Sequence, residues 1–181
     1  NTLISASKKS TIEKILISGN IDARDFRTMR DSMPMLTYID ISEATIVAYD
    51  GEYGTTNNPS YYPSDTVPQY AFYDINKMYP DGGISLKSII LPNSIKAINF
   101  SAFNYCLNLK HITIPEGVVY IGDNAFDYCQ SLSDIQLPSS LKTISNYAFN
   151  NCINLQNINL PDSLNSIGEY AFNYCYSIDS V

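Results

Sequence analysis

The stretch LKSIILPNSIKAINFSAFNYCLN, residues 86–108, decides the fold, because three further copies of its pattern follow directly. They read LKHITIPEGVVYIGDNAFDYCQS at 109–131, LSDIQLPSSLKTISNYAFNNCIN at 132–154 and LQNINLPDSLNSIGEYAFNYCYS at 155–177. A unit of 23 residues is too short to enclose a core, so it must stack on its neighbours. The repeat therefore predicts a stack of coils, an architecture that weighs against most enzymes.

Each copy begins with a short apolar strand that ends at a proline. In the first copy Leu86, Ile89 and Leu91 are followed by Pro92, which has no amide donor and stops the strand. Equivalent strands of successive coils are expected to pair in parallel, about 4.8 Å apart, so that residue n lies over residue n+23. Equivalent side chains therefore form columns along the stack.

The second half of each copy predicts further core positions and a turn. In the first copy Ile95 and Ile98 face the core, and the spacing of Ala102, Phe103 and Cys106 predicts one helical turn on the outer face. The predicted structural core column consists of Phe103, Phe126, Phe149 and Phe172 together with Cys106, Cys129, Cys152 and Cys175.

The four cysteines occupy one column, which predicts buried free thiols. Neighbouring Cα atoms would lie within disulfide range, but stacked Cβ vectors are parallel and do not suit the near-perpendicular torsion of a disulfide. A zinc site is excluded because a linear column does not converge on a metal and the chain has one histidine. No cofactor motif is present either, so no cofactor is expected.

The same template extends towards the N-terminus, where it begins at Ile12 and again at Leu36. We interpret 1–181 as a single domain, in which 1–35 form an N-terminal capping unit. Within this unit the apolar residues Ala23, Phe26 and Met29 predict an amphipathic helix that shields the end of the stack. At the other end, 178–181 begin a further repeat, and we expect the natural chain to continue or this end to pack against something else.

The repeat at 36–85 is enlarged by two tyrosine-rich insertions, at 50–66 and 73–85. Insertions in repeat proteins usually form surface loops on one face, and tyrosine is a favoured residue of binding loops. The alternative is that the insert packs on itself and on the array with its hydroxyls satisfied. The candidate binding residues of the insert are Tyr53, Tyr61, Tyr62, Tyr73 and Tyr79.

The outward positions of the first strand form a second candidate surface, which we call the strand ribbon. It consists of Tyr38, Asp40, Ser88, Ile90, His111, Thr113, Asp134, Gln136, Asn157 and Asn159. In a solenoid this ribbon is concave, rigid and accessible, and its neutral hydrogen-bonding groups suit a protein or a glycan. Ser88, His111 and Asp134 also follow the order of a hydrolase triad, but parallel side chains on an open sheet offer no oxyanion donors.

Composition excludes two classes of partner. The net charge of −7 and the eleven dispersed basic residues argue against nucleic acid, whose binding needs clustered lysine and arginine. No apolar run approaches the length of about 20 residues that spans a bilayer, so no direct membrane insertion of this segment is expected.

The pattern LPxSLxxIxxxAFxxC resembles the BspA-like leucine-rich repeats of bacterial cell-surface proteins over residues 12–181. The resemblance implies an α/β leucine-rich-repeat solenoid: a curved, right-handed stack of coils with a parallel sheet on its concave face and short helical turns on its convex face. It also implies an extracellular protein, secreted or anchored at the cell surface, that acts in adhesion. The matching positions are scaffold positions, so no ligand-binding residue carries over.

Three functions follow as hypotheses. The first is a non-enzymatic adhesion module that binds an extracellular protein or glycan of a host or neighbouring cell. The second is a structural stalk that spaces other domains, and the third is a hydrolase that uses Ser88, His111 and Asp134. We favour adhesion, because the insert is where this chain departs from a plain repeat.

Overall fold

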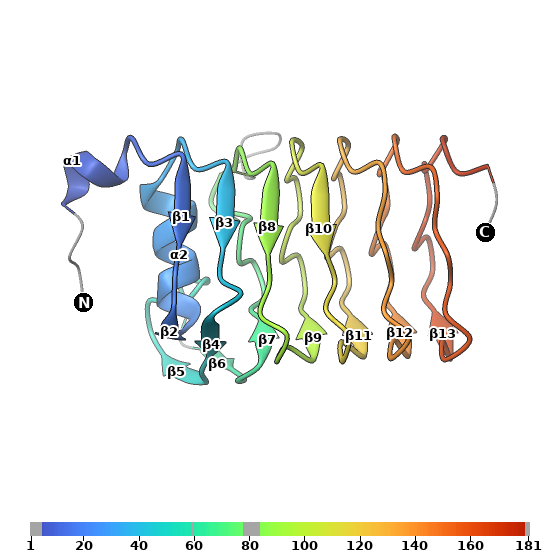
Figure 1. The fold of residues 1–181 in the computed structure, drawn as a ribbon, viewed down its shortest axis with the longest axis horizontal. Coiled ribbons are helices and arrows are strands. Elements are labelled where there is room, and N and C mark those ends of the chain that lie inside the picture. Colours follow the sequence, from blue (N-terminus) through green and yellow to red (C-terminus); the bar gives the residue numbers. More distant parts are fainter. Residues whose placement is uncertain (1–4, 59, 78–83, 180–181) are drawn as a thin grey trace.

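A computed structural model describes residues 5–58, 60–77 and 84–179 as one continuous stack of coils, in which each coil lies beside the next along the molecule (Figure 1). The helices are α1 (Ala6–Lys9) and α2 (Ala23–Ser32). The strands are β1 (Lys14–Leu16), β2 (Gly19–Ile21), β3 (Tyr38–Asp40), β4 (Ala44–Ile46), β5 (Tyr49–Gly51), β6 (Ser60–Tyr62), β7 (Thr66–Val67), β8 (Ser88–Ile90), β9 (Ala97–Ile98), β10 (His111–Thr113), β11 (Tyr120–Ile121), β12 (Thr143–Ile144) and β13 (Ser166–Ile167).

The predicted parallel register is confirmed. Tyr38 pairs with Ser88 across the enlarged repeat, and Ser88 pairs with His111 one coil further on. These pairs belong to a sheet in the order β1-β3-β8-β10. The sheet ends earlier than expected: in the next two coils only an isolated parallel bridge joins Asp134 and Asn157. Aspartate and asparagine are depleted in strands, which accounts for the weaker ladder in these coils.

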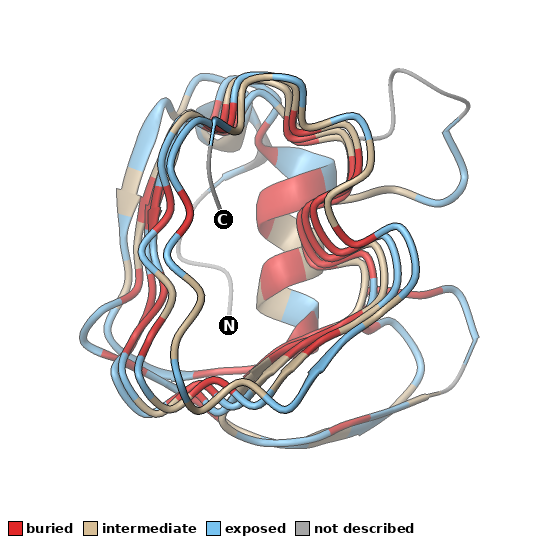
Figure 2. Ribbon diagram, turned by 90° about the vertical axis from the view of Figure 1, so that its right-hand side faces the viewer, coloured by how far each residue is buried: buried red, intermediate tan, exposed pale blue. Residues whose placement is uncertain are grey.

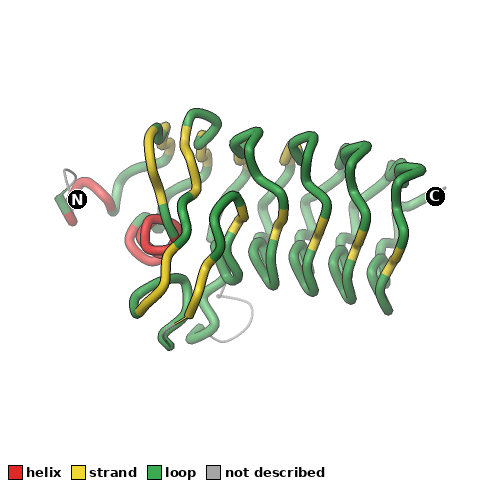
Figure 3. The backbone as a smooth tube through the Cα atoms, turned by 90° about the horizontal axis from the view of Figure 1, so that it is seen from below, coloured by secondary structure: helices red, strands yellow, loops and turns green. Residues whose placement is uncertain are grey.

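A second parallel sheet, in the order β13-β12-β11-β9-β7, runs along another face of the stack. Its strands recur once per coil and lie side by side from coil to coil (Figure 3). Tyr120 pairs with Ala97 on one side and with Thr143 on the other, so the same 23-residue offset applies. The sequence pattern marked this segment as an inward-facing apolar edge but did not predict a strand.

The expected helical turn at Ala-Phe-x-x-Cys is a run of tight turns instead. Alternate amides bond locally, as in Ala102 N–H to Asn99 O, at 3.2 Å, whereas the amide of Phe103 donates to Ala125 O of the next coil, at 2.8 Å. Ser101 and Tyr105 have φ values of 51° and 54°, which no right-handed helix contains. The turns therefore form a third ladder of hydrogen bonds between coils.

One continuous apolar core fills the stack, with buried residues on the inner side of each coil (Figure 2). The predicted phenylalanine column forms its axis: Phe126 stacks on Phe103 and on Phe149, with ring centroids 5.1 Å apart in both pairs. The cysteines line the same column, and all four are free thiols. The Cys129 thiol donates to Phe103 O at 3.2 Å, a contact repeated by Cys152 and Cys175.

Burial explains why most of these thiols are expected to be unreactive. It raises the pKa of Cys106, Cys129 and Cys152, because the charged thiolate is not solvated in the core. Cys175 is only half-buried, and its hydrogen bond with Cys152 lowers its pKa.

The predicted N-terminal helix is α2, which lies across the end of the coils (Figure 2). Asp22 and Asp25 form a reciprocal capping box that fixes its start. Phe26 is fully buried and packs edge-on against Phe72, with ring centroids 5.8 Å apart. Because Phe72 stacks on Phe103, α2 extends the phenylalanine column by one layer and covers it.

A buried polar ladder runs beside this column, and one member does not fit it. Asn173 Nδ2 donates to Asn150 Oδ1 at 3.1 Å, and Asn150 Nδ2 donates to Asp127 Oδ1 at 2.8 Å. Asp127 in its charged form can accept hydrogen bonds but cannot donate one to the next residue of the ladder. Among the described residues, Asn104 Oδ1, at the next place in the ladder, is the buried side-chain polar atom without a hydrogen-bond partner. Burial raises the pKa of Asp127, although amide donors oppose this shift.

We expect Asp127→Asn to raise the free energy of unfolding at neutral pH by about 1 kcal/mol, because the new amide supplies the missing donor to Asn104 and this gain outweighs the loss of the longer bond, at 3.1 Å, that Asp127 Oδ2 accepts from Asn124 Nδ2. A raised carboxyl pKa means that the folded chain holds the proton more tightly, so the wild type loses stability as pH rises through that pKa. The gain should therefore shrink on acidification and vanish below about pH 4, the ordinary aspartate range.

Urea denaturation of both proteins across this pH range measures the difference. Asp123→Asn is the matched control, because Asp123 is a half-buried acid in a neighbouring column, and Asn146 in that column already makes the equivalent bond. A gain that does not change with pH, or a loss of stability at neutral pH, would contradict the assignment.

Candidate functional site

The first insertion is an antiparallel hairpin, β5 paired with β6, that α2 holds in place. Arg30 of α2 is 4% exposed, and its Nη1 donates to the backbone carbonyls of Thr55, Tyr70 and Tyr73 at 2.9, 2.8 and 3.1 Å. Its Nε also pairs with Asp31, at 2.6 Å. One buried guanidinium therefore joins the capping helix, the insert and the first turn of the array.

Tyr62 is the centre of a small core within the insert. Its ring stacks on Tyr49, and its hydroxyl accepts the amide of Thr56 at 3.0 Å. Gly54 lies so close to the Tyr62 ring that a Cβ at this position would overlap the ring atoms. Burial disfavours the Tyr62 phenolate, but the hydrogen bonds, chiefly those with Thr56, outweigh it and lower the pKa. The insert is thus a packed hairpin rather than a loose loop.

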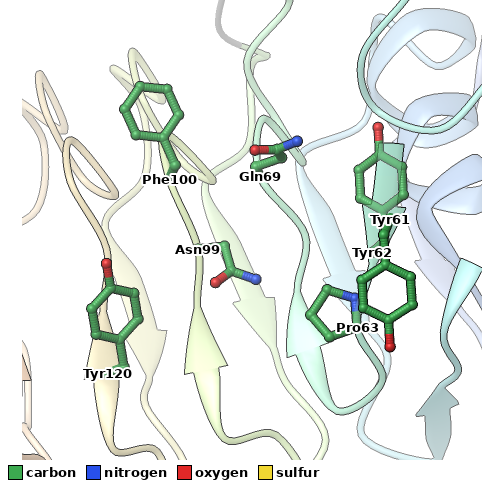
Figure 4. Close-up of a pocket in the computed structure, with 7 residues that line it drawn as sticks. All are labelled: Tyr61, Tyr62, Pro63, Gln69, Asn99, Phe100 and Tyr120. Carbon is green, nitrogen blue, oxygen red and sulfur yellow. The ribbon is translucent and has the colours of Figure 1, made fainter. Parts of the chain in front are cut away.

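A pocket of about 250 Å³ lies where this hairpin meets the second sheet (Figure 4). Its lining residues are Tyr61, Tyr62, Pro63, Gln69, Asn99, Phe100 and Tyr120. The hairpin residues Tyr61, Tyr62 and Pro63 stand on one side and Tyr120 on the other, with Asn99 between them (Figure 4). The lining residue Gln69 is held by the insert, since Thr55 Oγ1 donates to the Gln69 carbonyl at 2.5 Å.

The lining has a definite chemical character. It combines aromatic rings with the two amide side chains of Gln69 and Asn99 and contains no charged side chain. Aromatic faces bind apolar surfaces, and amides both donate and accept hydrogen bonds. The pocket therefore suits a small, neutral group that has an apolar face and hydroxyl or amide edges.

The tyrosines predicted as binding residues of the insert divide into different groups. Tyr61 lines the pocket and is 65% exposed, whereas Tyr53 is 70% exposed and lies outside it. Tyr62 is buried in the hairpin core, and Tyr73 stacks on Tyr105 of the first regular repeat, with centroids 5.6 Å apart. Tyr79 lies outside the described residues. The self-packing interpretation thus holds for Tyr62, whereas Tyr61 faces outward and its role in binding stays a prediction.

The strand ribbon lies on the other sheet, and the structure arranges it in two rows. Tyr38, Ser88 and His111 are successive partners in one row, and Asp40, Ile90 and Thr113 are successive partners in the other. In the later coils Asp134, Gln136, Asn157 and Asn159 are exposed. Ser42 donates to Asp40 from its backbone amide and from its hydroxyl, and these bonds lower the Asp40 pKa. Asp40 thus caps a turn as well as facing outward.

The residues of the hypothetical triad do not form a charge relay. Ser88 and His111 are neighbours, but the carboxylate of Asp134 accepts a hydrogen bond from Gln136 at 3.3 Å. No hydrogen bond joins His111 to either Ser88 or Asp134 in the described part of the chain. The row therefore lacks the base-orienting contact that such a mechanism requires.

Five pocket residues were not among the sequence candidates: Pro63, Gln69, Asn99, Phe100 and Tyr120. One signal was available. The column that contains Tyr120 otherwise holds Ala97, Thr143 and Ser166, so a large ring interrupts a column of small residues. The remaining residues belong to the site only because the hairpin folds back against the second sheet, and a repeat pattern cannot predict that contact.

The described ranges contain no cluster of three or more His, Cys, Asp or Glu side chains that could hold a metal ion. In the same ranges, no helix has both the length and the apolar character needed to cross a membrane.

Solved structures with the same fold come from several bacteria. The leucine-rich repeat protein of T. pallidum is 21% identical, with a TM-score of 0.62 over 93% of this chain and 78% of that one. A leucine-rich cell surface protein of Faecalibacterium prausnitzii is 23% identical (TM-score 0.54, 93% and 47% covered), and a Bacteroides ovatus leucine-rich repeat protein is 26% identical (0.53, 91% and 44%). The chain thus spans less than half the length of the last two.

No curated protein matches the chain at a significant level. The model of the BspA type leucine rich repeat region matches residues 65–181 in six copies, which is more than half of the chain. The chain therefore belongs to the BspA-type leucine-rich repeat family.

Proposed function

We propose that the chain is a non-enzymatic binding module at a bacterial cell surface, and that the pocket beside the insert holds a neutral sugar unit of an extracellular glycan, free or carried on a protein. The family supports a binding or structural role, and the relative from F. prausnitzii is described as a cell surface protein. The observation that carries the proposal is the uncharged pocket of rings and amides.

Each feature of this pocket matches a feature of a sugar ring. Its aromatic rings offer faces for the apolar side of a pyranose, and the amides of Gln69 and Asn99 match hydroxyls as donors or acceptors. A volume of about 250 Å³ lies just below the range of pockets that hold whole drug-sized ligands, so one end unit of a larger ligand fits it. The absence of a charged lining group favours neutral over acidic sugars.

Binding of the purified chain to a panel of neutral glycans, mucins and extracellular-matrix proteins at physiological salt tests the proposal. We expect saturable binding to a neutral glycan or a mucin, and we expect Tyr61→Ser to lower the affinity about tenfold, because an exposed stacking ring is removed.

Tyr53→Ser is the matched control. Tyr53 is an equally exposed tyrosine of the same insert that does not line the pocket, so its replacement should leave the affinity unchanged. If no member of the panel binds, or if both variants bind like the wild type, the proposal fails and a structural spacer becomes the better account of this chain.

A further inference from the structure

A series of tyrosines on the turn face of the coils is not used by the pocket or by the core. Two positions of each turn have left-handed backbone, with φ between 51° and 58°. The first position is occupied by Tyr70, Ser101, Asn124, Tyr147 and Tyr170, and the second by Tyr105, Tyr128, Asn151 and Tyr174. Six of these nine residues are therefore tyrosines.

The backbone of these turns does not call for tyrosine. A left-handed φ is unfavourable for a bulky side chain, whereas asparagine tolerates it. Asparagine does occur at these two positions in this chain, since Asn124 and Asn151 occupy them with φ values of 55° and 56°. Unfavourable backbone that carries aromatic side chains points to a use for the rings.

The rings form an ordered and accessible surface. Tyr147 and Tyr170 stack with centroids 5.1 Å apart, and Tyr174 lies 5.8 Å from Tyr176. Tyr147 remains 38% exposed although a coil flanks it on each side, so the accessibility of this position does not depend on the last described coil, in which Tyr170 and Tyr174 are 56% and 51% exposed. We call these four residues the tyrosine face.

The charge around the tyrosine face has one sign. The four turns, 99–108, 122–131, 145–154 and 168–177, contain no lysine or arginine, and Glu169 is exposed next to Tyr170. Over 97–181 the chain has two lysines, Lys110 and Lys142, against the acidic residues Glu116, Asp123, Asp127, Asp134, Asp162, Glu169 and Asp179. A cation would therefore meet aromatic faces in a negative field without a competing positive side chain.

We propose that the tyrosine face binds an arginine-rich segment of a partner protein. A guanidinium is planar, stacks on aromatic faces and also pairs with carboxylates, so it matches both the rings and Glu169. The pocket is lined by residues between Tyr61 and Tyr120, whereas the tyrosine face begins at Tyr147 in a later coil, so this surface is separate from the proposed glycan site and does not depend on it.

Two synthetic peptides of equal length, six Arg-Gly repeats and six Lys-Gly repeats, serve as probes in fluorescence anisotropy at physiological salt. We expect the arginine peptide to bind more tightly. The double variant Tyr147→Asn/Tyr170→Asn should bind it about five- to thirtyfold more weakly, because two stacking contacts are lost. This variant should stay folded, since asparagine is native at the equivalent positions of other coils.

Tyr53→Asn is the control, because Tyr53 is also exposed, also has positive φ (66°) and lies in the insert instead. The Tyr53→Asn variant should bind the arginine peptide with the affinity of the wild type. The inference is overturned by equal binding of both peptides, by no binding, or by a double variant that binds like the wild type. A concentration-dependent dimer in sedimentation that the double variant abolishes would also overturn it, by assigning the face to a second copy of the chain.

Discussion

Replacement of Arg30 by methionine is expected to lower the free energy of unfolding by about 3 kcal/mol. Methionine fills a similar volume but leaves the carbonyls of Thr55, Tyr70 and Tyr73 without the donor that Arg30 Nη1 provides. Hydrogen bonds from a charged group contribute about 1.5–3 kcal/mol each, and buried acceptors left unpaired add a desolvation cost. Urea denaturation measures the loss.

Arg27→Met is the control for Arg30, because Arg27 is on the same helix and reaches the same insert. Its bonds to Gly54 O and Thr56 O are longer, at 3.3 Å, and its side chain is partly exposed. We expect a loss of about 1 kcal/mol or less from this change. Limited proteolysis should cut the insert faster in Arg30→Met than in Arg27→Met. Equal stability of the two variants would show that Arg30 does not hold the insert.

The register of the stack was predictable because a strict repeat constrains it completely. Once Leu86 and Leu109 are recognised as equivalent, Ser88 must pair with His111, as it does. The same template placed Tyr38 beside Ser88 although they are 50 positions apart, because the apolar pattern resumes after the insertions. The capping helix could also be predicted from the sequence, since its apolar residues pack against the end of a column that the repeats define.

The turns and the second sheet were harder to predict from the sequence, because their conformation depends on the neighbouring coil. An Ala-Phe-x-x-Cys segment satisfies a helical spacing, but the amide of Phe103 is bonded to Ala125 of the next coil and is unavailable for a helix. Competition between local and inter-coil hydrogen bonds decides whether the segment forms a helix or a run of turns. The sequence pattern of one segment gives information on the local hydrogen bonds only.

The candidate site shows the same division. Tyr61 could be selected from the sequence because it is a tyrosine in an insertion. Tyr120 becomes part of the site only through the fold of the β5–β6 hairpin, which in turn depends on Arg30 and on the contact between Gly54 and Tyr62. These contacts join residues that no repeat relates to one another.

The second large effect is expected in the phenylalanine column, where position along the stack should decide the cost of the same substitution. Phe126→Ala removes a fully buried ring that stacks at 5.1 Å on both neighbours, so we expect a loss of about 3–5 kcal/mol. In the last described coil, Phe172→Ala removes an equivalent ring that stacks, among the described residues, on Phe149 alone and is half-buried, so in this chain the loss should be about 2 kcal/mol or less. Urea denaturation compares the two. Since a repeat array is stabilised by contacts between adjacent units, equal losses at both sites would mean that the stacked rings do not carry the coupling between coils.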